Sequence, residues 1–307
     1  MEASLRWIPV TAVAPVAWGT TYFVTNRYLP AGYPLYGAAI RALPAGLLLL
    51  LLRRRLPHGS WWWRSLVLGA LNMGAFFALV YLAAQSLPTS VASTIMATSP
   101  VVMMLFAWAA LSERPRLAQL AGAALGIAGV ALMLLGRGGT VHASGVLASV
   151  GAMTMSSFGY VLTKRWGNGV DVVSLSAWQL VAGGLILAPA ALFVEGAPPT
   201  VDGRALVGFG YVTVVATALA FVAWFTGLRH LGAGTVGLVG LLNPITGVLL
   251  GTALGGESLA AQQLWGLALV LSGILLGQPV TVRLLAPVLR GRRHPQLTVG
   301  RSRNANA

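Results

Sequence analysis

The sequence contains no cysteine. This absence excludes disulfide bonds, thiolate metal ligands and cysteine nucleophiles in one step. Acids and histidines are scarce too, six and four in 307 residues, and all of them lie outside the centres of the apolar stretches described below. Catalysis by paired carboxylates, by a nucleophile with its base or by a metal ion needs such groups together. We therefore predict that the chain is not an enzyme, and we expect neither a metal site nor a cofactor.

Charge of either sign is also rare. Charged residues make up 8% of the chain and hydrophobic residues 57%, and the mean hydropathy is +0.79. A soluble domain carries about 25% charged residues, so this chain does not have enough polar side chains to cover a water-exposed surface. The composition predicts a membrane protein.

Long apolar runs are what the sequence has in abundance. A membrane-spanning helix needs about 20 mostly apolar residues, and short polar or Pro/Gly-rich connections separate the runs that qualify. The first run contains Pro15 and Gly19 and has no cleavage site behind it, which favours a retained helix over a signal peptide. Ten stretches qualify: about 7–26, 33–52, 65–85, 90–111, 117–136, 143–163, 173–194, 205–227, 233–254 and 261–281.

The chain contains an internal duplication, which is the first thing to seek in a sequence. A shift of 144 residues superposes two segments without a gap, and a shift of 138 residues superposes the front parts of the two halves more weakly. At 144 the matches are Leu87/Leu231, Pro100/Pro244, Glu113/Glu257, Gln119/Gln263, Gly122/Gly266 and Gly129/Gly273. At 138 they are Tyr22/Tyr160, Thr25/Thr163, Arg27/Arg165 and Gly46/Gly184, with Arg41 opposite Gln179.

These matches divide the chain into a repeat at 1–138, a second repeat at 139–283 and a basic tail at 284–307. Each repeat holds five apolar stretches. After five crossings the second repeat starts from the opposite side of the membrane, so the two repeats are inverted. We predict an all-α polytopic membrane protein with ten transmembrane helices in two inverted five-helix repeats.

Basic residues predict the orientation, because Lys and Arg collect on the cytoplasmic side. With the N-terminus inside, sixteen basic residues fall on the inner side against three on the outer side, Arg27, Arg137 and Arg204. Both termini are therefore expected in the cytoplasm. The tail has no apolar period and is expected to be disordered; it acts either as a topological anchor or by contacting anionic lipid headgroups. Without a folded basic module, the net charge of +14 does not indicate nucleic-acid binding.

Two prolines lie near the middle of the fourth and ninth stretches. Pro100 and Pro244 each remove a backbone donor and free the carbonyl four residues earlier, that of Met96 or Gly240. Broken helices at matching positions of inverted repeats are typical of secondary transporters, where the freed groups line a cavity. A pair of packing kinks is the alternative.

Polar and amphipathic side chains at similar depth are candidates for a substrate cavity. For Asn72 and Asn243 a helix–helix hydrogen bond is an equal alternative, and for tryptophan and tyrosine the alternative is an anchor at the membrane interface, as we expect for Trp61, Trp62 and Trp63. The candidates are Trp18, Thr21, Tyr22, Asn72, Tyr81, Ser99, Ser157, Tyr160, Trp224 and Asn243.

A second set of polar residues is assigned a structural role. Arg41 lies about eight residues inside its stretch, but its repeat partner is the neutral Gln179, which indicates a polar clamp between helices. Glu113 and Glu257 lie near helix ends and are expected to hold those ends. Glycines at four-residue spacing, such as Gly122 and Gly126, predict close helix packing.

With these residues the chain resembles the EamA-domain branch of the drug/metabolite transporter superfamily. The resemblance rests on Trp18–Gly19, on Arg41, and on the duplicated Pro…Glu…Gly…Gly pattern at 100/113/122/129 and 244/257/266/273, and it covers about residues 7–280. It implies two EamA domains, a central cavity, and export of amino acids or related metabolites across the plasma membrane. Gln179 opposite Arg41 departs from strict symmetry, so no role shared by both halves is implied for Arg41.

The expected function is a secondary transporter that exports a small neutral or zwitterionic solute, because the candidate cavity has no acid for a cationic drug. A drug-like or nucleotide-derived metabolite is the alternative substrate. A membrane scaffold or regulatory subunit without transport is the alternative function. The sequence leaves the solute, the ion coupling and the oligomeric state open.

Overall fold

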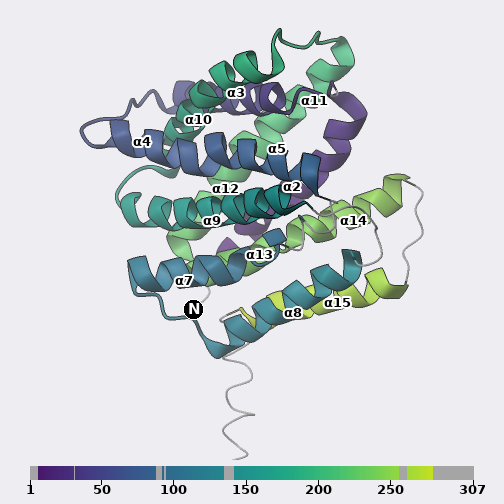
Figure 1. Cartoon of the computed structure of the whole chain (residues 1–307). Helices are drawn as coiled ribbons and strands as arrows, with labels where there is room; N and C mark the ends of the chain where they lie inside the picture. Colours follow the sequence, from purple (N-terminus) through teal and green to yellow (C-terminus); the bar gives the residue numbers. More distant parts are fainter. Residues whose placement is uncertain are drawn as a thin grey trace, which may run out of the picture.

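The structure, a computed structural model, describes residues 6–30, 32–87, 92, 95–134, 142–255 and 261–278 (Figure 1). Every regular element in these ranges is a helix, which confirms the all-α prediction. The predicted basic tail and Glu257 lie outside the described residues.

Each half of the chain folds into helices that follow the predicted apolar stretches. The first half contains α2 (Trp7–Tyr28), α3 (Pro34–Arg53), α4 (Trp61–Gly69), η1 (Ala70–Gly74), α5 (Ala75–Ser86), α7 (Ser99–Leu111) and α8 (Leu117–Leu134). The second half contains α9 (Ala143–Trp166), α10 (Val172–Glu195), α11 (Gly203–Thr213), η2 (Val214–Leu219), α12 (Ala220–His230), α13 (Ala233–Gly240), α14 (Leu242–Gly255) and α15 (Ala261–Leu276).

The outer surface of these helices is apolar. Leu117, Leu147 and Phe193 expose 85%, 73% and 86% of their surface, in a pattern that a water-soluble monomer does not tolerate over large areas. Among the described residues, five helical stretches are long and apolar enough to cross a membrane: Pro34–Arg53, Trp61–Val80, Ala143–Trp166, Val172–Glu195 and Gly203–His230. The total of ten spans stays a prediction.

The two halves interlock. Helix α2 of the first half packs against α12, α13 and α14 of the second, and α9 of the second half packs against α5 and α7 of the first. In Figure 1 the α3–α10 pair lies at the top beside α11, and the α8–α15 pair lies at the bottom. Neither half therefore forms its core alone, and the centre of the molecule lies between the halves.

Glycine contacts show how the halves are related. Along α8 and α15, Gly122 lies against the carbonyl of Gly273 and Gly129 against the carbonyl of Gly266, so close that neither glycine has room for a side chain. Residue numbers rise along one helix as they fall along the other, so the pair is antiparallel. The 144-residue shift pairs Gly122 with Gly266 and Gly129 with Gly273, so it exchanges these two contacts. Such an exchange is the pattern of a two-fold axis perpendicular to the helices.

The α3–α10 pair repeats this pattern. If Gly46 had a Cβ, that atom would lie 2.6 Å from Val181 N, and a Cβ on Gly184 would lie 2.8 Å from Leu43 N. These contacts also exchange under the 138-residue shift, and they are also antiparallel. A two-fold axis across the helices inverts one half relative to the other, as the odd number of predicted crossings per repeat requires.

The fourth and ninth stretches are both interrupted. Residues 97–98 form a turn before α7, and Leu241 forms a turn between α13 and α14. Pro100 is the second residue of α7 and Pro244 the third of α14. A proline in the first turn of a helix does not disturb it, because the N–H groups there have no intrahelical partner. Both prolines therefore begin a new helix rather than bend an existing one.

The third and eighth stretches contain a feature that the sequence does not predict. Each is a continuous helix with a π-helical segment, η1 or η2, near its middle. The first residues of the two segments, Ala70 and Val214, are 144 residues apart, which is the repeat distance. A π-helix widens the turn and shifts the backbone hydrogen bonds, and such segments are frequent at functional sites.

Candidate functional site

Five aromatic side chains meet between the two halves and form what we call the aromatic site. Trp18 of α2 lies 5.2 Å from Phe221 and 5.2 Å from Trp224 of α12, measured between ring centroids. Tyr160 of α9 lies 5.5 Å from Trp224 and 6.2 Å from Phe225. The rings meet at tilted or edge-on angles, which their quadrupoles prefer. Trp18, Tyr160 and Trp224, all predicted cavity residues, are thus brought together.

Two buried polar atoms of this region lack a hydrogen-bond partner among the described residues. They are Nε1 of Trp224, which is 3% exposed, and Oγ of Ser157, which is 1% exposed. Ser157 precedes Tyr160 by three residues on α9, so the two share a helix face. Each unpaired polar group costs about 1–3 kcal/mol of stability.

The interrupted ninth stretch lies beside the aromatic site. A carbon built on Gly240, the last residue of α13, would lie 3.3 Å from the Trp224 ring. On the α2 side, a carbon built on Gly19 would lie 2.6 Å from the carbonyl oxygen of Asn243. Gly19 therefore allows α2 to approach the break closely, and any larger residue would push the two helices apart.

The following predicted cavity residues are not among the five rings of the aromatic site. Thr21 Oγ1 donates to Ala17 O of its own helix at 3.2 Å. Ser99 begins α7 and Asn243 is the second residue of α14, both partly buried. Tyr22 and Tyr81 lie on α2 and α5, with side chains outside the described part of the structure.

Asn72 is buried in a helix–helix contact. It lies within η1, and its Nδ2 donates to Gln179 Oε1 at 2.7 Å and to Thr163 Oγ1 at 3.2 Å. Thr163 Oγ1 and Gln179 Oε1 lie 3.3 Å apart, and Gln179 Nε2 donates to Leu175 O at 3.2 Å. This arrangement, the amide bridge, is the helix–helix alternative that the sequence left open for Asn72.

Arg41 makes the corresponding contact with donor and acceptor exchanged, because here the π-helical segment accepts. Its Nε donates to Thr217 Oγ1 at 2.8 Å and its Nη2 to Ala216 O at 3.0 Å, both within η2. The guanidinium also lies 5.5 Å from the ring centroid of Phe77. We call this contact the arginine bridge. It joins α3 of the first half to η2 of the second, as the polar clamp expected of Arg41 would.

Glu113 holds helix ends from both halves together. Its carboxylate pairs with Lys164 Nζ at 2.5 Å and accepts from Ala233 N, at the start of α13, at 2.9 Å. Lys164 Nζ also donates to Leu231 O at 2.7 Å. The sequence does not predict this pairing of Glu113 with Lys164, because nothing in it links residues 51 positions apart that are not repeat equivalents.

In the described part of the chain, no three His, Asp or Glu side chains come close enough together to hold a metal ion. The chemistry available to the aromatic site is therefore that of ring stacking, one indole N–H, one serine hydroxyl and the backbone groups of the helix break. These groups offer apolar contact and hydrogen bonds.

Comparison with known proteins supports this description. The model of the EamA-like transporter family matches residues 5–135 and again residues 143–277. Protein PecM of Dickeya dadantii is 35% identical over 271 residues, which are 88% of this chain and 91% of PecM. A probable amino-acid metabolite efflux pump of Salmonella typhimurium is 26% identical over 279 residues, which cover 85% of this chain and 91% of the pump.

A solved crystal structure shares the fold, with a TM-score of 0.78 at 21% identity, over 92% of this chain and 98% of that chain. The uncharacterized inner membrane transporter YedA of Escherichia coli K12 is 28% identical over 272 residues, 85% of this chain and 87% of YedA. With one family match in each half and relatives along most of its length, this chain belongs to the EamA-like transporter family and is a membrane transporter.

Proposed function

We propose that the chain is a secondary transporter that exports amino acids or related small neutral or zwitterionic metabolites by alternating access through the aromatic site. The observation that carries this proposal is the buried, unpaired Nε1 of Trp224, in a site built from both halves. A solute oxygen would accept a hydrogen bond from this N–H in the bound state.

The composition of the site favours a solute without net charge. None of the five rings carries a charge, so a bound ion would have no counter-charge among them. A zwitterion has partners at the neighbouring break. Pro244 has no N–H to donate to Gly240 O, which suits an ammonium group, and the first turn of α14 has free N–H groups, which suit a carboxylate.

One relative supports this direction of transport, since the Salmonella typhimurium protein is described as a probable amino-acid metabolite efflux pump. For this chain we place the protein in the plasma (inner) membrane with both termini in the cytoplasm, on the strength of the sixteen inner and three outer basic residues.

Trp224→Phe tests the proposal, because it keeps an aromatic ring but removes the N–H together with part of the ring volume. The full-length protein would be reconstituted in liposomes and tested for counterflow with pools of amino acids, other metabolites, drug-like compounds and nucleotide-derived compounds. Loss of one hydrogen bond of about 0.5–1.5 kcal/mol lowers solute affinity about two- to tenfold. Trp108→Phe is the matched control, because Trp108 is 53% exposed on α7.

The expected result is weaker counterflow per folded molecule for Trp224→Phe and normal counterflow for Trp108→Phe. The smaller ring also leaves a cavity that lowers the unfolding temperature, so flux is expressed per folded molecule to separate binding from folding. Flux that equals that of empty vesicles for every pool would instead favour the scaffold or regulatory alternative.

A further inference from the structure

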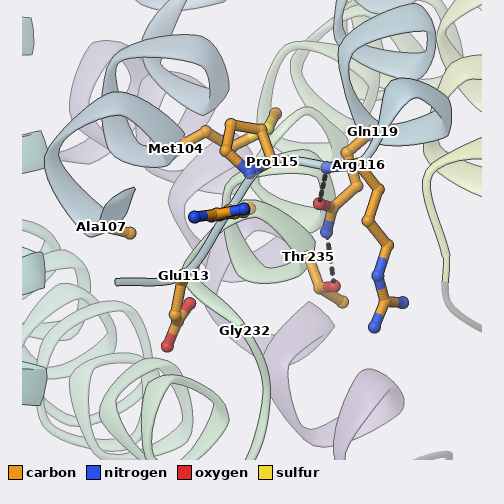
Figure 2. Close-up of a pocket in the computed structure, with 10 residues that line it drawn as sticks. Met104, Ala107, Glu113, Pro115, Arg116, Gln119, Gly232 and Thr235 are labelled. Atoms are coloured by element: carbon orange, nitrogen blue, oxygen red, sulfur yellow. Dashed lines mark hydrogen bonds between the residues drawn. The ribbon is translucent and has the colours of Figure 1, made fainter. Parts of the chain in front are cut away.

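A second site lies away from the aromatic rings, at the end of the molecule where Glu113 pairs with Lys164. A pocket of about 290 Å³ opens where α7 ends, where the connection to α8 runs and where α13 begins (Figure 2). Its polar lining includes Arg114, Arg116, Gln119 and Thr235 besides Glu113. A volume of this size accommodates a polar headgroup but not a macromolecule.

The charge of this pocket is positive. Lys164 at 2.5 Å neutralises the charge of Glu113, which also accepts a hydrogen bond from Ala233 N at 2.9 Å. The two arginines of the lining remain, and both are exposed at the pocket. The pocket therefore presents two guanidinium groups, whose planar donors match the oxygens of a phosphate.

The wall that carries these arginines is held in place. Gln119, which is 8% exposed, accepts from Arg116 N at 3.1 Å and donates from Nε2 to Thr235 Oγ1 at 3.4 Å, so it joins α8 to α13 (Figure 2). Pro115 between the two arginines fixes one backbone dihedral of the connection. The backbone of the site is therefore preformed, and a ligand needs to order only the exposed arginine side chains.

The surroundings of the pocket place it at the edge of the bilayer. Leu105 and Trp108 on α7 are 51% and 53% exposed, and Leu117 and Leu120 on α8 are 85% and 38% exposed. These side chains form apolar outer surface next to the pocket, and a tryptophan at such a boundary is typical of the headgroup level. A ligand that fills the pocket and also covers this surface must combine an anionic group with acyl chains.

We propose that this pocket binds the phosphate of an anionic membrane phospholipid, with the acyl chains lying along α7 and α8. Basic pockets between membrane helices bind anionic headgroups through the same combination of charge and apolar surface. The proposal concerns a site distinct from the aromatic site and does not depend on the identity of the solute. It also differs from the predicted contact between the basic tail and lipid, because it assigns two folded residues.

The test compares two double variants of the full chain that remove the same charge. Arg114→Gln with Arg116→Gln empties the pocket of guanidinium groups. Arg54→Gln with Arg55→Gln removes two exposed arginines from the α3–α4 connection, on the side that is also predicted to be cytoplasmic. Retained lipids would be counted by native mass spectrometry during titration with phosphatidylglycerol or phosphatidylcholine, and inorganic phosphate would be added as a competitor.

We expect one phosphatidylglycerol to bind the unmodified protein and the Arg54/Arg55 control with equal affinity, and no comparable binding of phosphatidylcholine. Each arginine near an anionic group contributes about fivefold, so the Arg114/Arg116 variant should bind about thirtyfold more weakly. Equal losses in both double variants would reduce the effect to general surface charge and overturn the proposal. Displacement of the lipid by millimolar phosphate would identify a site for a soluble anion and would also overturn it.

Discussion

The arginine bridge and the amide bridge occupy equivalent places in the two halves, yet they differ in chemistry. Arg41 and Gln179 correspond at the 138-residue shift, and η1 and η2 correspond at the 144-residue shift. In the arginine bridge α3 donates to η2, from Arg41 to Thr217. In the amide bridge η1 donates to α10, from Asn72 to Gln179. Duplication has kept the position of a polar contact but not its donor, its acceptor or its charge.

This difference has an energetic consequence. Hydrogen bonds to charged groups contribute about 1.5–3 kcal/mol and neutral ones about 0.5–1.5 kcal/mol. The arginine bridge uses a charged donor for two contacts, one of them to a backbone carbonyl within a π-helix, where the normal helical bonding is displaced. The amide bridge is neutral and has a reserve acceptor, because Thr163 lies within reach of both amides. We expect the first contact to matter more for stability than the second.

Arg41→Leu should have the largest effect of the changes considered. It removes both donors from η2 and leaves Ala216 O and Thr217 Oγ1 without them, so we expect a loss of about 3 kcal/mol in the free energy of unfolding. The measurement is denaturant unfolding of the purified protein in mild detergent. Arg41→Gln is the matched control, because it installs the residue that the other half has at this place and can keep one donor. The control should lose less than half as much, and equal losses would contradict the role assigned to the guanidinium.

Asn72→Leu should have a smaller effect. Polar contacts between membrane helices average about 0.6 kcal/mol and reach about 1.7 kcal/mol, and Gln179 Oε1 keeps Thr163 nearby after the change. The loss of the unpaired Oδ1 of Asn72 further offsets the cost. A double-mutant cycle with Gln179→Leu, followed by the same unfolding measurement, gives the coupling directly. A coupling as large as the whole effect of Arg41→Leu would show that the two bridges are energetically alike.

Much of the fold could be predicted from the sequence, for identifiable reasons. The apolar stretches are longer than their connections, so their helices follow from length and composition, as for Val172–Glu195. The inversion follows from the ungapped 144-residue match, and the contacts of Gly122 with Gly273 have the geometry that it requires. The π-helical segments could not be predicted, because they arise from a shift in backbone hydrogen bonding that no residue type marks.

The sequence predicts how deep in the membrane the candidate residues lie, but not which way their side chains point. Position along a stretch indicates how far a residue lies in the membrane, and Trp18, Tyr160 and Trp224 are cavity candidates for that reason. The same reasoning selected Asn72, whose side chain points toward Gln179 and Thr163. Which way a side chain points depends on the packing of helices from both halves, so the sequence left a helix contact and a solute contact as equal alternatives.

The end of the α3–α10 pair offers the finest comparison, because its charges lie outside the membrane core. Asp171 caps α10 through Ser174 N at 3.0 Å and pairs with Arg53 at the end of α3 at 3.0 Å. Partial burial opposes ionisation of Asp171, but the hydrogen bonds from Ser174 and the charge of Arg53 outweigh it and hold the pKa of the carboxyl below its ordinary value. A pKa lowered by folding means stability that is present above the unfolded pKa of about 3.9 and is lost as the pH falls through the folded pKa.

Asp171→Asn isolates the charge, since asparagine caps a helix as well as aspartate does. The pair is partly exposed, so we expect the smallest loss of the three changes, about 0.2–1 kcal/mol at neutral pH. The difference in unfolding temperature between Asp171→Asn and the unmodified protein should shrink as the pH falls below about 4 and should also shrink in high salt. Asp202→Asn is the control: Asp202 caps α11 through Ala205 N at 2.7 Å, and no basic side chain of the described residues forms a salt bridge with it. A difference for Asp171→Asn that persists unchanged at low pH would show that altered capping causes it, and not the loss of the pairing of Asp171 with Arg53. The arginine bridge and the amide bridge would then be the remaining comparison in which a charge distinguishes the halves.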